Sequence, residues 1–426
     1  MPSDTIFALS SGRPPAAISV IRISGPAAHD AAARIAGSLP DARTAAVREL
    51  RHPLTRALLD EALVLRFDSP ASSTGEDVVE LQCHGGRAVV DALLGALTVV
   101  DGLREARPGE FTRRAFDNGR IDLTEAEGLA DLIEAETESQ RKAALALAEG
   151  GLSKQIGAWQ ERLLALSAMA ERAIDYDEQD EAVDPAQLDA CAALAAELRQ
   201  WLDRPRMEPL KDGVRVVVAG PPNAGKSSLI NCITGEERSI VTDVPGTTRD
   251  HIEVPLSLGG VPLRLTDTAG LRATDDPVEA IGVERAEKLV EAADVLVWLG
   301  PPGQAPKHPR LIEVHAKADL PDRGPAPTGA IPVSSVTGEG VAALLQRVES
   351  LGRSLLPAEN SIALNRRQAQ HVGEAAAALG AAAESGDLVL VAEDLRLARS
   401  AFDRLTGRAG VEDVLDALFS RFCLGK

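Results

Sequence analysis

Aromatic residues make up only 3% of this 426-residue chain, and it contains only four cysteines. So few aromatic side chains argue against a surface on which nucleic-acid bases stack. The cysteines, Cys83, Cys191, Cys232 and Cys423, lie far apart and show no paired spacing. They therefore predict reduced thiols in the cytosol, and they argue against a disulfide framework or a zinc site.

Two further absences limit where the protein works. No apolar stretch approaches the roughly 20 residues that are needed to cross a bilayer. The first residues, Met1-Pro-Ser-Asp-Thr5, lack the basic and apolar regions of a secretory signal. We therefore expect a cytoplasmic protein with no membrane partner. Because the net charge is −19, the chain is not expected to coat nucleic acid, and an RNA contact needs a local patch or a partner's surface.

The most informative segment is Gly220-Pro-Pro-Asn-Ala-Gly-Lys-Ser227, which has every position of a phosphate-binding loop. It follows the apolar run Val214–Ala219, which predicts a strand, and it precedes a predicted helix. The motif requires that context. The alternative, an ordinary strand–helix turn rich in glycine and serine, does not explain why the motif and both flanking elements agree.

The residue types of this loop suit a nucleoside triphosphate. Gly220 and Gly225 allow several backbone N–H groups and a helix N-terminus to point at a phosphate. Lys226 is expected to reach the β- and γ-phosphates, and the Ser227 hydroxyl to hold Mg²⁺.

The length suggests about three domains, and the patterns of apolar residues along the sequence indicate where they lie. Apolar runs at Ala17–Ile23, Glu61–Phe67 and Val78–Cys83 predict strands of an α/β domain. Alanine, leucine and glutamate at helical spacing predict a helical bundle that is interrupted by the nucleotide domain. The predicted fold class is therefore multidomain α/β plus all-α. The predicted segments are an N-terminal domain at 1–117, the first helical part at 118–208, the G domain at 209–356 and the second helical part at 357–426.

The inserted segment carries the remaining parts of a GTPase in the expected order. Thr247-Thr248-Arg249-Asp250 is placed to supply a threonine to Mg²⁺ and the γ-phosphate. A predicted hairpin around Gly259-Gly260 leads to Asp267-Thr-Ala-Gly270, where Asp267 is expected to bind Mg²⁺ through water and the Gly270 N–H to sense the γ-phosphate.

Base specificity is assigned to Ala316-Lys-Ala-Asp319. The Asp319 carboxylate can accept hydrogen bonds from N1–H and the 2-amino group of guanine, a donor pair that adenine lacks. The usual motif begins with Asn where this chain has Ala316. We expect guanine preference to survive, with binding weaker by about 1–3 kcal/mol.

The residue after Asp-x-x-Gly is Leu271, whereas small signalling GTPases place there a glutamine that orients the attacking water. Glu279 is the candidate replacement, although a solvated glutamate in the first turn of a helix is the more common interpretation of such a residue. Asn223 either shapes the loop or binds a monovalent cation beside the phosphates. Arg249 and Arg272 are rival sources of charge, but both are typical of surface residues.

Motifs along the whole chain resemble one family, the tRNA-modification GTPases called MnmE or TrmE. The resemblance rests on the phosphate loop with the segment 240–250, and on motifs outside the G domain. The latter are Arg22-Ile-Ser-Gly25, Gly75-Glu-Asp-Val-Val-Glu-Leu-Gln-Cys-His-Gly-Gly86, Arg107-Pro-Gly-Glu-Phe-Thr112, the run from Ala115 to Glu127, and the ending Phe419-Ser-Arg-Phe-Cys-Leu-Gly-Lys426.

The resemblance implies functions for residues that the motifs alone leave open. It implies a K⁺ site at Asn223, Thr242, Val244 and Thr247, Mg²⁺ held by Ser227 and Thr248, and Glu279 as the residue that orients water. It also implies an N-terminal folate-binding domain that forms a homodimer. Residues matching the 5-formyltetrahydrofolate site are Arg22, Glu80, Arg120 and Lys426.

Cys423 is the candidate reactive residue in the terminal motif. A lone cysteine near a helical C-terminus is more often a buried apolar packing residue. The resemblance instead implies a thiolate beside Lys426 that acts as a nucleophile or as an acid or base in uridine chemistry.

The resemblance implies a potassium-activated GTPase that modifies the wobble uridine of tRNAs at C5, adding a carboxymethylaminomethyl or aminomethyl group. A tetrahydrofolate supplies the one-carbon unit, and the partner is the FAD- and NADH-dependent protein MnmG (GidA). Two alternatives are an RNA-binding switch such as a ribosome-assembly GTPase, and a degenerate G domain that serves as a scaffold. The expected nucleotide contacts are Asn223, Ala224, Gly225, Lys226, Ser227, Ser228, Thr242, Asp243, Val244, Pro245, Gly246, Thr247, Thr248, Asp267, Thr268, Ala269, Gly270, Lys317, Asp319, Ser334 and Ser335.

Overall fold

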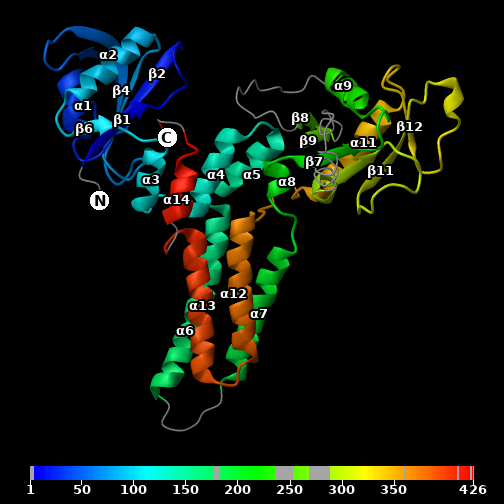
Figure 1. Ribbon diagram of the computed structural model, residues 1–426. Helices are drawn as coiled ribbons and strands as arrows, with labels where there is room; N and C mark the ends of the chain where they lie inside the picture. The colour runs from blue at the N-terminus through cyan, green and yellow to red at the C-terminus, as the bar shows by residue number, and fades with distance from the viewer. Residues whose placement is uncertain are drawn as a thin grey trace, which may run out of the picture. The chain divides into compact units, whose positions relative to one another are not determined.

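The computed structural model describes residues 4–176, 183–236, 253–267, 288–358, 361–409, 412–422 and 425. The chain divides into two compact units, and each is described by itself (Figure 1). The first unit comprises residues 1–133, 147–168 and 395–426, and the second comprises residues 134–146 and 169–394.

The first unit contains a six-stranded sheet in the order β3-β4-β5-β2-β1-β6. Its strands pair antiparallel, except that β1 and β6 run parallel. The bounds are β1 (Thr5–Leu9), β2 (Ile18–Ser24), β3 (Ala45–Arg51), β4 (Leu58–Phe67), β5 (Val78–His84) and β6 (Leu103–Glu105).

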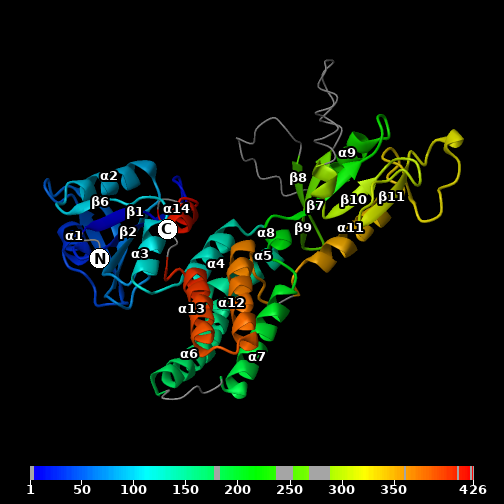
Figure 2. The same ribbon diagram turned by 60° about the horizontal axis from the view of Figure 1, so that its bottom comes forward.

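One face of this sheet is covered by two helices, α1 (Ala28–Ala36) and α2 (Arg87–Thr98) (Figures 1 and 2). Alternate strand residues such as Ile21, Ile23 and Leu81 point into this core and are fully buried, as expected when side chains alternate between the two faces of a strand.

Among the described residues, a helix covers the opposite face at one end. There α3 (Glu110–Asp117) packs Phe111 against Ile6 and Ala8 of β1. Farther along the sheet, Ile18 of β2 is 60% exposed and Val47 of β3 is 54% exposed. The open part of this face therefore carries apolar side chains as well as polar ones.

Helices complete the first unit. They are α4 (Leu123–Glu134), α14 (Glu412–Phe419), and those parts of α6 (Gly151–Tyr176) and α13 (Leu388–Thr406) that belong to it. Trp159 and Phe402 stack with ring centroids 6.0 Å apart, and α4 packs on α14 through buried residues that include Leu123 and Phe419.

The helices of the second unit include α5 (Glu138–Ala148), α7 (Pro185–Leu202) and α12 (Arg366–Glu384), and α7 and α12 run side by side in both views (Figures 1 and 2). Asp184 caps α7 through the Ala186 N–H, and Asn365 forms a capping box with Gln368 at the start of α12. Such caps satisfy N–H groups that have no partner inside a helix.

The second sheet has the order β12-β11-β10-β7-β9-β8. All neighbouring strands are parallel except the β8–β9 hairpin. The bounds are β7 (Val214–Ala219), β8 (Glu253–Leu258), β9 (Val261–Asp267), β10 (Val295–Trp298), β11 (Leu311–Ala316) and β12 (Ile331–Val333). This sheet is that of a phosphate-loop α/β domain. With the first sheet and the helices, it confirms the predicted combination of α/β and all-α parts.

Helices α9 (Lys226–Glu236) and α11 (Val341–Leu355) cover one face of the second sheet. Parallel neighbours are usually joined by a crossover helix. Here residues 299–310, all of which are described, join β10 to β11 with no helix. Residues 317–330 join β11 to β12 with only the short turn η2 (Pro321–Arg323). Short α8 (Glu208–Lys211) precedes β7. Among the described residues, no helix combines the length and apolarity that a membrane span requires.

Candidate functional site

The phosphate loop lies between the end of β7 and the start of α9. Gly220 and Gly225 have φ values of 153° and 100°, which side chains with a Cβ rarely adopt. Asn223 has φ 60°, a left-handed conformation that Asn tolerates better than most residues. A Cβ at Gly220 would also lie only 3.2 Å from the Leu299 carbonyl carbon. The sequence pattern thus fits the backbone geometry that a phosphate cradle needs.

Lys226 is the first residue of α9, and its side chain folds back over the loop. It is 7% exposed, and Nζ donates to the carbonyl oxygens of Gly220 and Pro221 at 3.0 and 2.9 Å. The ammonium is therefore held at the loop, where it can neutralise phosphate oxygens.

Ser227 and Asp267 come from different elements and meet beside the loop. Ser227 Oγ donates a hydrogen bond of 2.7 Å to Asp267 Oδ2. Asp267 is the last residue of β9 and is 7% exposed. Hydroxyl and carboxylate oxygens are the ligands that Mg²⁺ prefers, directly or through water. These two residues fit a magnesium site.

A cavity of ≈ 260 Å³ opens beside the loop. Lys317, with φ 63°, stands at its edge and donates from Nζ to the Asn223 carbonyl at 2.8 Å. The cavity is lined by Gly225, Ser228, Leu229, Ala316, Lys317, Asp319, Leu320, Val333, Ser335 and Val336. It therefore brings the residues predicted for base recognition next to the phosphate loop.

Ser334 lies just behind this cavity and is fully buried. Its Oγ accepts hydrogen bonds from the N–H groups of Val336 and Thr337, at 3.2 and 3.1 Å. Ser334 therefore shapes the loop after β12, while its neighbour Ser335 lines the cavity.

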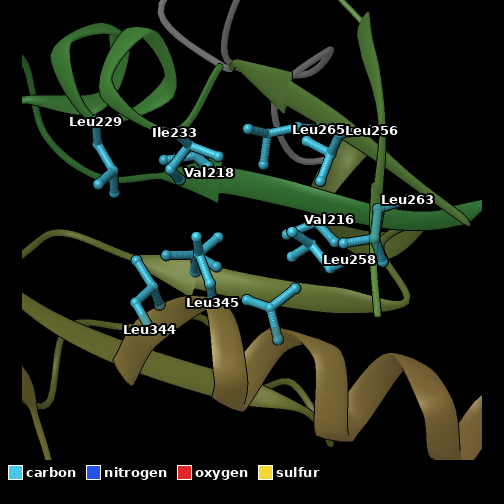
Figure 3. A pocket seen from close by; sticks show the side chains of 12 residues that line it. Val216, Val218, Leu229, Ile233, Leu256, Leu258, Leu263, Leu265, Leu344 and Leu345 are labelled. Atoms are coloured by element: carbon cyan, nitrogen blue, oxygen red, sulfur yellow. The ribbon is translucent and has the colours of Figure 1, made fainter. Parts of the chain in front are cut away.

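Another pocket of the same domain is its hydrophobic core and carries no chemistry. Aliphatic side chains of the sheet face Leu229 and Ile233 of α9 and Leu344 and Leu345 of α11 (Figure 3). The hollow measures only ≈ 20 Å³, about the space of one water molecule, and polar side chains do not line it.

In the first unit, Arg22 and Glu80 lie opposite each other on β2 and β5. Glu80 Oε1 accepts from Arg22 Nη2 and Nε at 2.8 and 3.0 Å. The Arg22 guanidinium also lies 5.6 Å from the centre of the Phe111 ring, within the range of a cation–π contact. The pair sits on the sheet face that helices leave partly open. Arg120, the third predicted folate residue, packs its side chain near Gly75.

A buried ion network fixes α3 and hence the position of Phe111. Arg114 is 2% exposed and contacts the carboxylates of Asp4, Glu76 and Glu110 at 3.0 to 3.2 Å. Burial opposes ionisation of Glu110, but hydrogen bonds from Arg104, the Arg107 N–H and Arg114, with the charge of Arg104, outweigh it and lower its pKa. The pKa of Asp4 is lowered against burial in the same way, mainly by Arg104.

The carboxy-terminal segment reaches the end of β1. A Cβ on Gly425 would collide with the carbonyl oxygen of Leu9 and with Cα of Ser10, so only glycine fits this approach. β1 is the strand beside β2, and Ala8 pairs with Arg22. Gly425 thus lies beside the strand that neighbours Arg22 of β2.

A group of His29, Asp68 and Asp77 has ligand atoms within 4.8 Å of one another. Arg66 donates to Asp68 at 2.7 Å, and the Ser69 N–H donates to Asp77 at 2.9 Å. His29 of α1 lies 3.5 Å from Asp68 and 3.6 Å from Asp77, so contacts among protein groups account for the cluster.

Several predicted residues lie outside the described part of the chain, and their predicted roles rest on sequence. They are Glu279 and Cys423, the folate residue Lys426, Leu271, the rival arginines Arg249 and Arg272, and the nucleotide or ion contacts Thr242, Asp243, Val244, Pro245, Gly246, Thr247, Thr248, Thr268, Ala269 and Gly270.

Two features of the sites were missed from sequence. Phe111 belongs to the motif Arg107–Thr112, but nothing in the sequence indicated that its ring contacts the Arg22 guanidinium. Arg114 gave no signal beyond its place in a short amphipathic helix, because its partners Asp4 and Glu76 are distant in sequence.

The chain matches the model of the MnmE helical domain over residues 123–423, and that of the N-terminus of the GTP-binding protein TrmE over residues 5–120. It is 52% identical over 426 residues to the tRNA modification GTPase MnmE of Erythrobacter litoralis, covering 99% of this chain and 100% of that protein. The chain belongs to the MnmE family. The corresponding protein of Zymomonas mobilis is 51% identical, with 99% and 100% covered.

Membership in the MnmE family confirms the prediction made from the motifs. It also confirms the predicted enzyme class, a GTP hydrolase that acts in tRNA modification. Among solved structures, the chain is similar to the G domain of the T. maritima FeoB iron transporter, with 23% identity and a TM-score of 0.25 over 32% of this chain and 98% of that one. That similarity is too slight to support an argument.

Proposed function

We propose that this chain is a potassium-activated GTPase that modifies the wobble uridine of tRNAs at C5, together with the FAD- and NADH-dependent protein MnmG. The reaction adds a carboxymethylaminomethyl or aminomethyl group. The observation that carries the proposal is the Ser227–Asp267 contact beside Lys226, in a member of a family of tRNA modification GTPases.

In this proposal the G domain works by electrostatic positioning. Lys226 neutralises the β- and γ-phosphates, and Ser227, Asp267 and Thr248 hold Mg²⁺. Because Leu271 cannot orient water, Glu279 takes that task. A bound K⁺ supplies the positive charge that an arginine finger gives elsewhere. It is held by Asn223, Thr242, Val244 and Thr247.

Asn223 supports the potassium proposal through its conformation. Its left-handed backbone is held by the hydrogen bond from Lys317 to its carbonyl oxygen. The loop residue is therefore fixed while its side-chain amide remains a candidate ligand beside the phosphates.

The nucleotide contacts proposed on the base side follow the cavity. Asp319 accepts from N1–H and the 2-amino group of guanine, and the aliphatic part of Lys317 covers the base. Ser335 lines the cavity and Ser334 holds its loop. These contacts select guanine.

The folate site is proposed on the open sheet face, with Arg22, Glu80, Arg120 and Lys426. A pterin presents adjacent N–H donors that a carboxylate such as Glu80 can accept, and cations suit the carboxylates of a folate tail. The contact of Gly425 with Leu9 and Ser10 supports the inclusion of Lys426. When bound, 5-formyltetrahydrofolate supplies the one-carbon unit.

The same face supports the proposed homodimer. Ile18 and Val47 are apolar and more than half exposed, and exposed apolar surface on a sheet indicates a partner. A second copy of the N-terminal domain, residues 1–117, would cover it.

Cys423 is proposed to act as a nucleophile, acid or base in the uridine chemistry, beside Lys426. Cys83 and Cys191 are buried free thiols, which fits the proposed cytoplasmic location. The boundaries 118–208, 209–356 and 357–426 for the helical and G domains are proposed on sequence texture.

The experiment is nucleoside analysis of tRNA from a strain that lacks this protein, complemented with the wild type or with Asp267→Asn. The wild type should restore the modified wobble uridine, and the variant should not. Co-purification with the flavoprotein partner is expected. Unchanged tRNA nucleosides in the deletion strain would favour an RNA-binding switch, and full restoration by Asp267→Asn would favour a scaffold.

A further inference from the structure

The segment that carries Lys317 and Asp319 is contacted by the side chain of Arg323, which lies at the end of the turn that follows it. Arg323, the last residue of η2, donates from Nε to the carbonyl oxygen of Ala316 at 3.0 Å. Backbone bonds from Leu320 N–H to Lys317 O and from Arg323 N–H to Leu320 O, each 3.1 Å, close the turn between them.

This contact falls at the position where the chain departs from the usual GTPase motif. Ala316 offers a methyl group where an Asn amide normally braces the base and the phosphate loop, and it is 7% exposed. No polar side chain is therefore available at position 316 itself. The guanidinium of Arg323 instead holds the backbone of the same residue.

The surroundings make such a brace important. The segment from 317 to 330 connects β11 to β12 with η2 in place of a crossover helix. A second cavity of ≈ 440 Å³ has Asn223, Lys317 and Arg323 among its lining residues. Lys317 therefore lines both cavities, and the segment that carries it contains no crossover helix.

We propose that Arg323 is a positioning residue for guanine recognition, which replaces the missing Asn by anchoring the Ala316 carbonyl and so fixes Lys317 and Asp319. The proposal rests on the base contacts proposed above. A hydrogen bond from a charged donor is stronger than one between neutral groups. The guanidinium therefore strengthens a turn that is otherwise held by backbone hydrogen bonds, among them that from Ala318 N–H to Val333 O at 3.1 Å.

The test measures dissociation constants of the full-length protein for GDP and IDP, which lacks the 2-amino group. Arg323→Ala should weaken GDP binding by about tenfold and IDP binding less, because a misplaced Asp319 loses its advantage at the 2-amino group. Arg323→Lys should fall between the wild type and Arg323→Ala. The control is Arg347→Ala, an exposed arginine on α11, which should leave both constants unchanged.

A double-mutant cycle tests the replacement itself. Ala316→Asn should recover most of the GDP affinity in the Arg323→Ala background. In the wild type it should change the affinity little, because Arg323 already supplies the brace, so the weaker binding expected from the motif alone does not apply. The idea is overturned if Arg323→Ala changes GDP binding less than twofold, if GDP and IDP weaken equally, or if Ala316→Asn acts equally in both backgrounds. Failure of the wild type to bind GDP would instead refute the proposed base contacts.

Discussion

Ser227 Oγ and Asp267 Oδ2 lie 2.7 Å apart, although they come from the first turn of α9 and the end of β9. β9 pairs with β7 in parallel, so that Val218 lies beside Asp267 and the phosphate loop follows immediately. The parallel register therefore places a carboxylate beside the loop hydroxyl, at the position proposed above for the magnesium ion.

Ser227→Ala should lower kcat for GTP hydrolysis by about 100-fold, because the magnesium ion that stabilises charge in the transition state loses a ligand. The measurement is steady-state phosphate release at saturating Mg²⁺. Thr234→Ala, on the same helix, removes a hydroxyl that bonds only the Asn231 carbonyl, and it should hydrolyse GTP at the wild-type rate. Equal rates for the two variants would contradict the proposed role of Ser227 as a magnesium ligand.

Arg114→Met should destabilise the first unit by about 3 kcal/mol, because it leaves buried carboxylates without their shared cation. Arg113→Ala is the matched control, since Arg113 pairs with Glu412 and Asp416 on the surface. It should cost about 1 kcal/mol or less. Urea unfolding followed by circular dichroism measures both, and similar losses for the two variants would contradict the structural role of the network.

The same network should make stability fall in acid. Hydrogen bonds from Arg104, the Arg107 N–H and Arg114, with the charge of Arg104, outweigh burial, so the folded-state pKa of Glu110 lies below its usual 4.5. The unfolded chain then binds more protons in this range. The stabilisation is complete above pH 4.5 and is lost as the pH falls through the lowered folded pKa. The free energy of unfolding should therefore decline more steeply between pH 6 and 3 for the wild type than for Glu110→Gln. Parallel curves would show that Glu110 contributes nothing.

Gly425→Ala should weaken 5-formyltetrahydrofolate binding by about tenfold, because the added methyl collides with the Leu9 backbone and moves the terminal segment. GTP hydrolysis should stay unchanged. Gly386→Ala, where a Cβ meets open space, is the control. Isothermal titration calorimetry measures the affinity. If Gly425→Ala binds folate as tightly as the wild type, the terminal segment is not part of the folate site.

Elements with a strong local pattern could be predicted from sequence. The apolar run Val214–Ala219 gave β7 with its observed bounds. β3 (Ala45–Arg51) was missed because its sequence carries three charged residues, and pairing with β4 stabilises it instead. β1 (Thr5–Leu9) is too short to show a clear pattern.

The site divides in the same way. Lys226 and Ser227 belong to one continuous motif, so their roles could be predicted before the fold was known. Two contacts could not be predicted from sequence: that of Arg22 with Phe111, and the hydrogen bond from Arg323 to the Ala316 carbonyl. The first depends on how a helix packs on a sheet, and the second on how a turn folds back.

The most direct test of the account compares GTP hydrolysis in K⁺ and in Na⁺ at equal ionic strength. Wild-type protein should hydrolyse GTP about 100-fold faster in K⁺. Asn223→Gly should lose that difference, since glycine keeps the left-handed backbone of this position and removes only the amide. Equal wild-type rates in the two salts, or potassium activation that survives Asn223→Gly, would contradict a cation site in this loop.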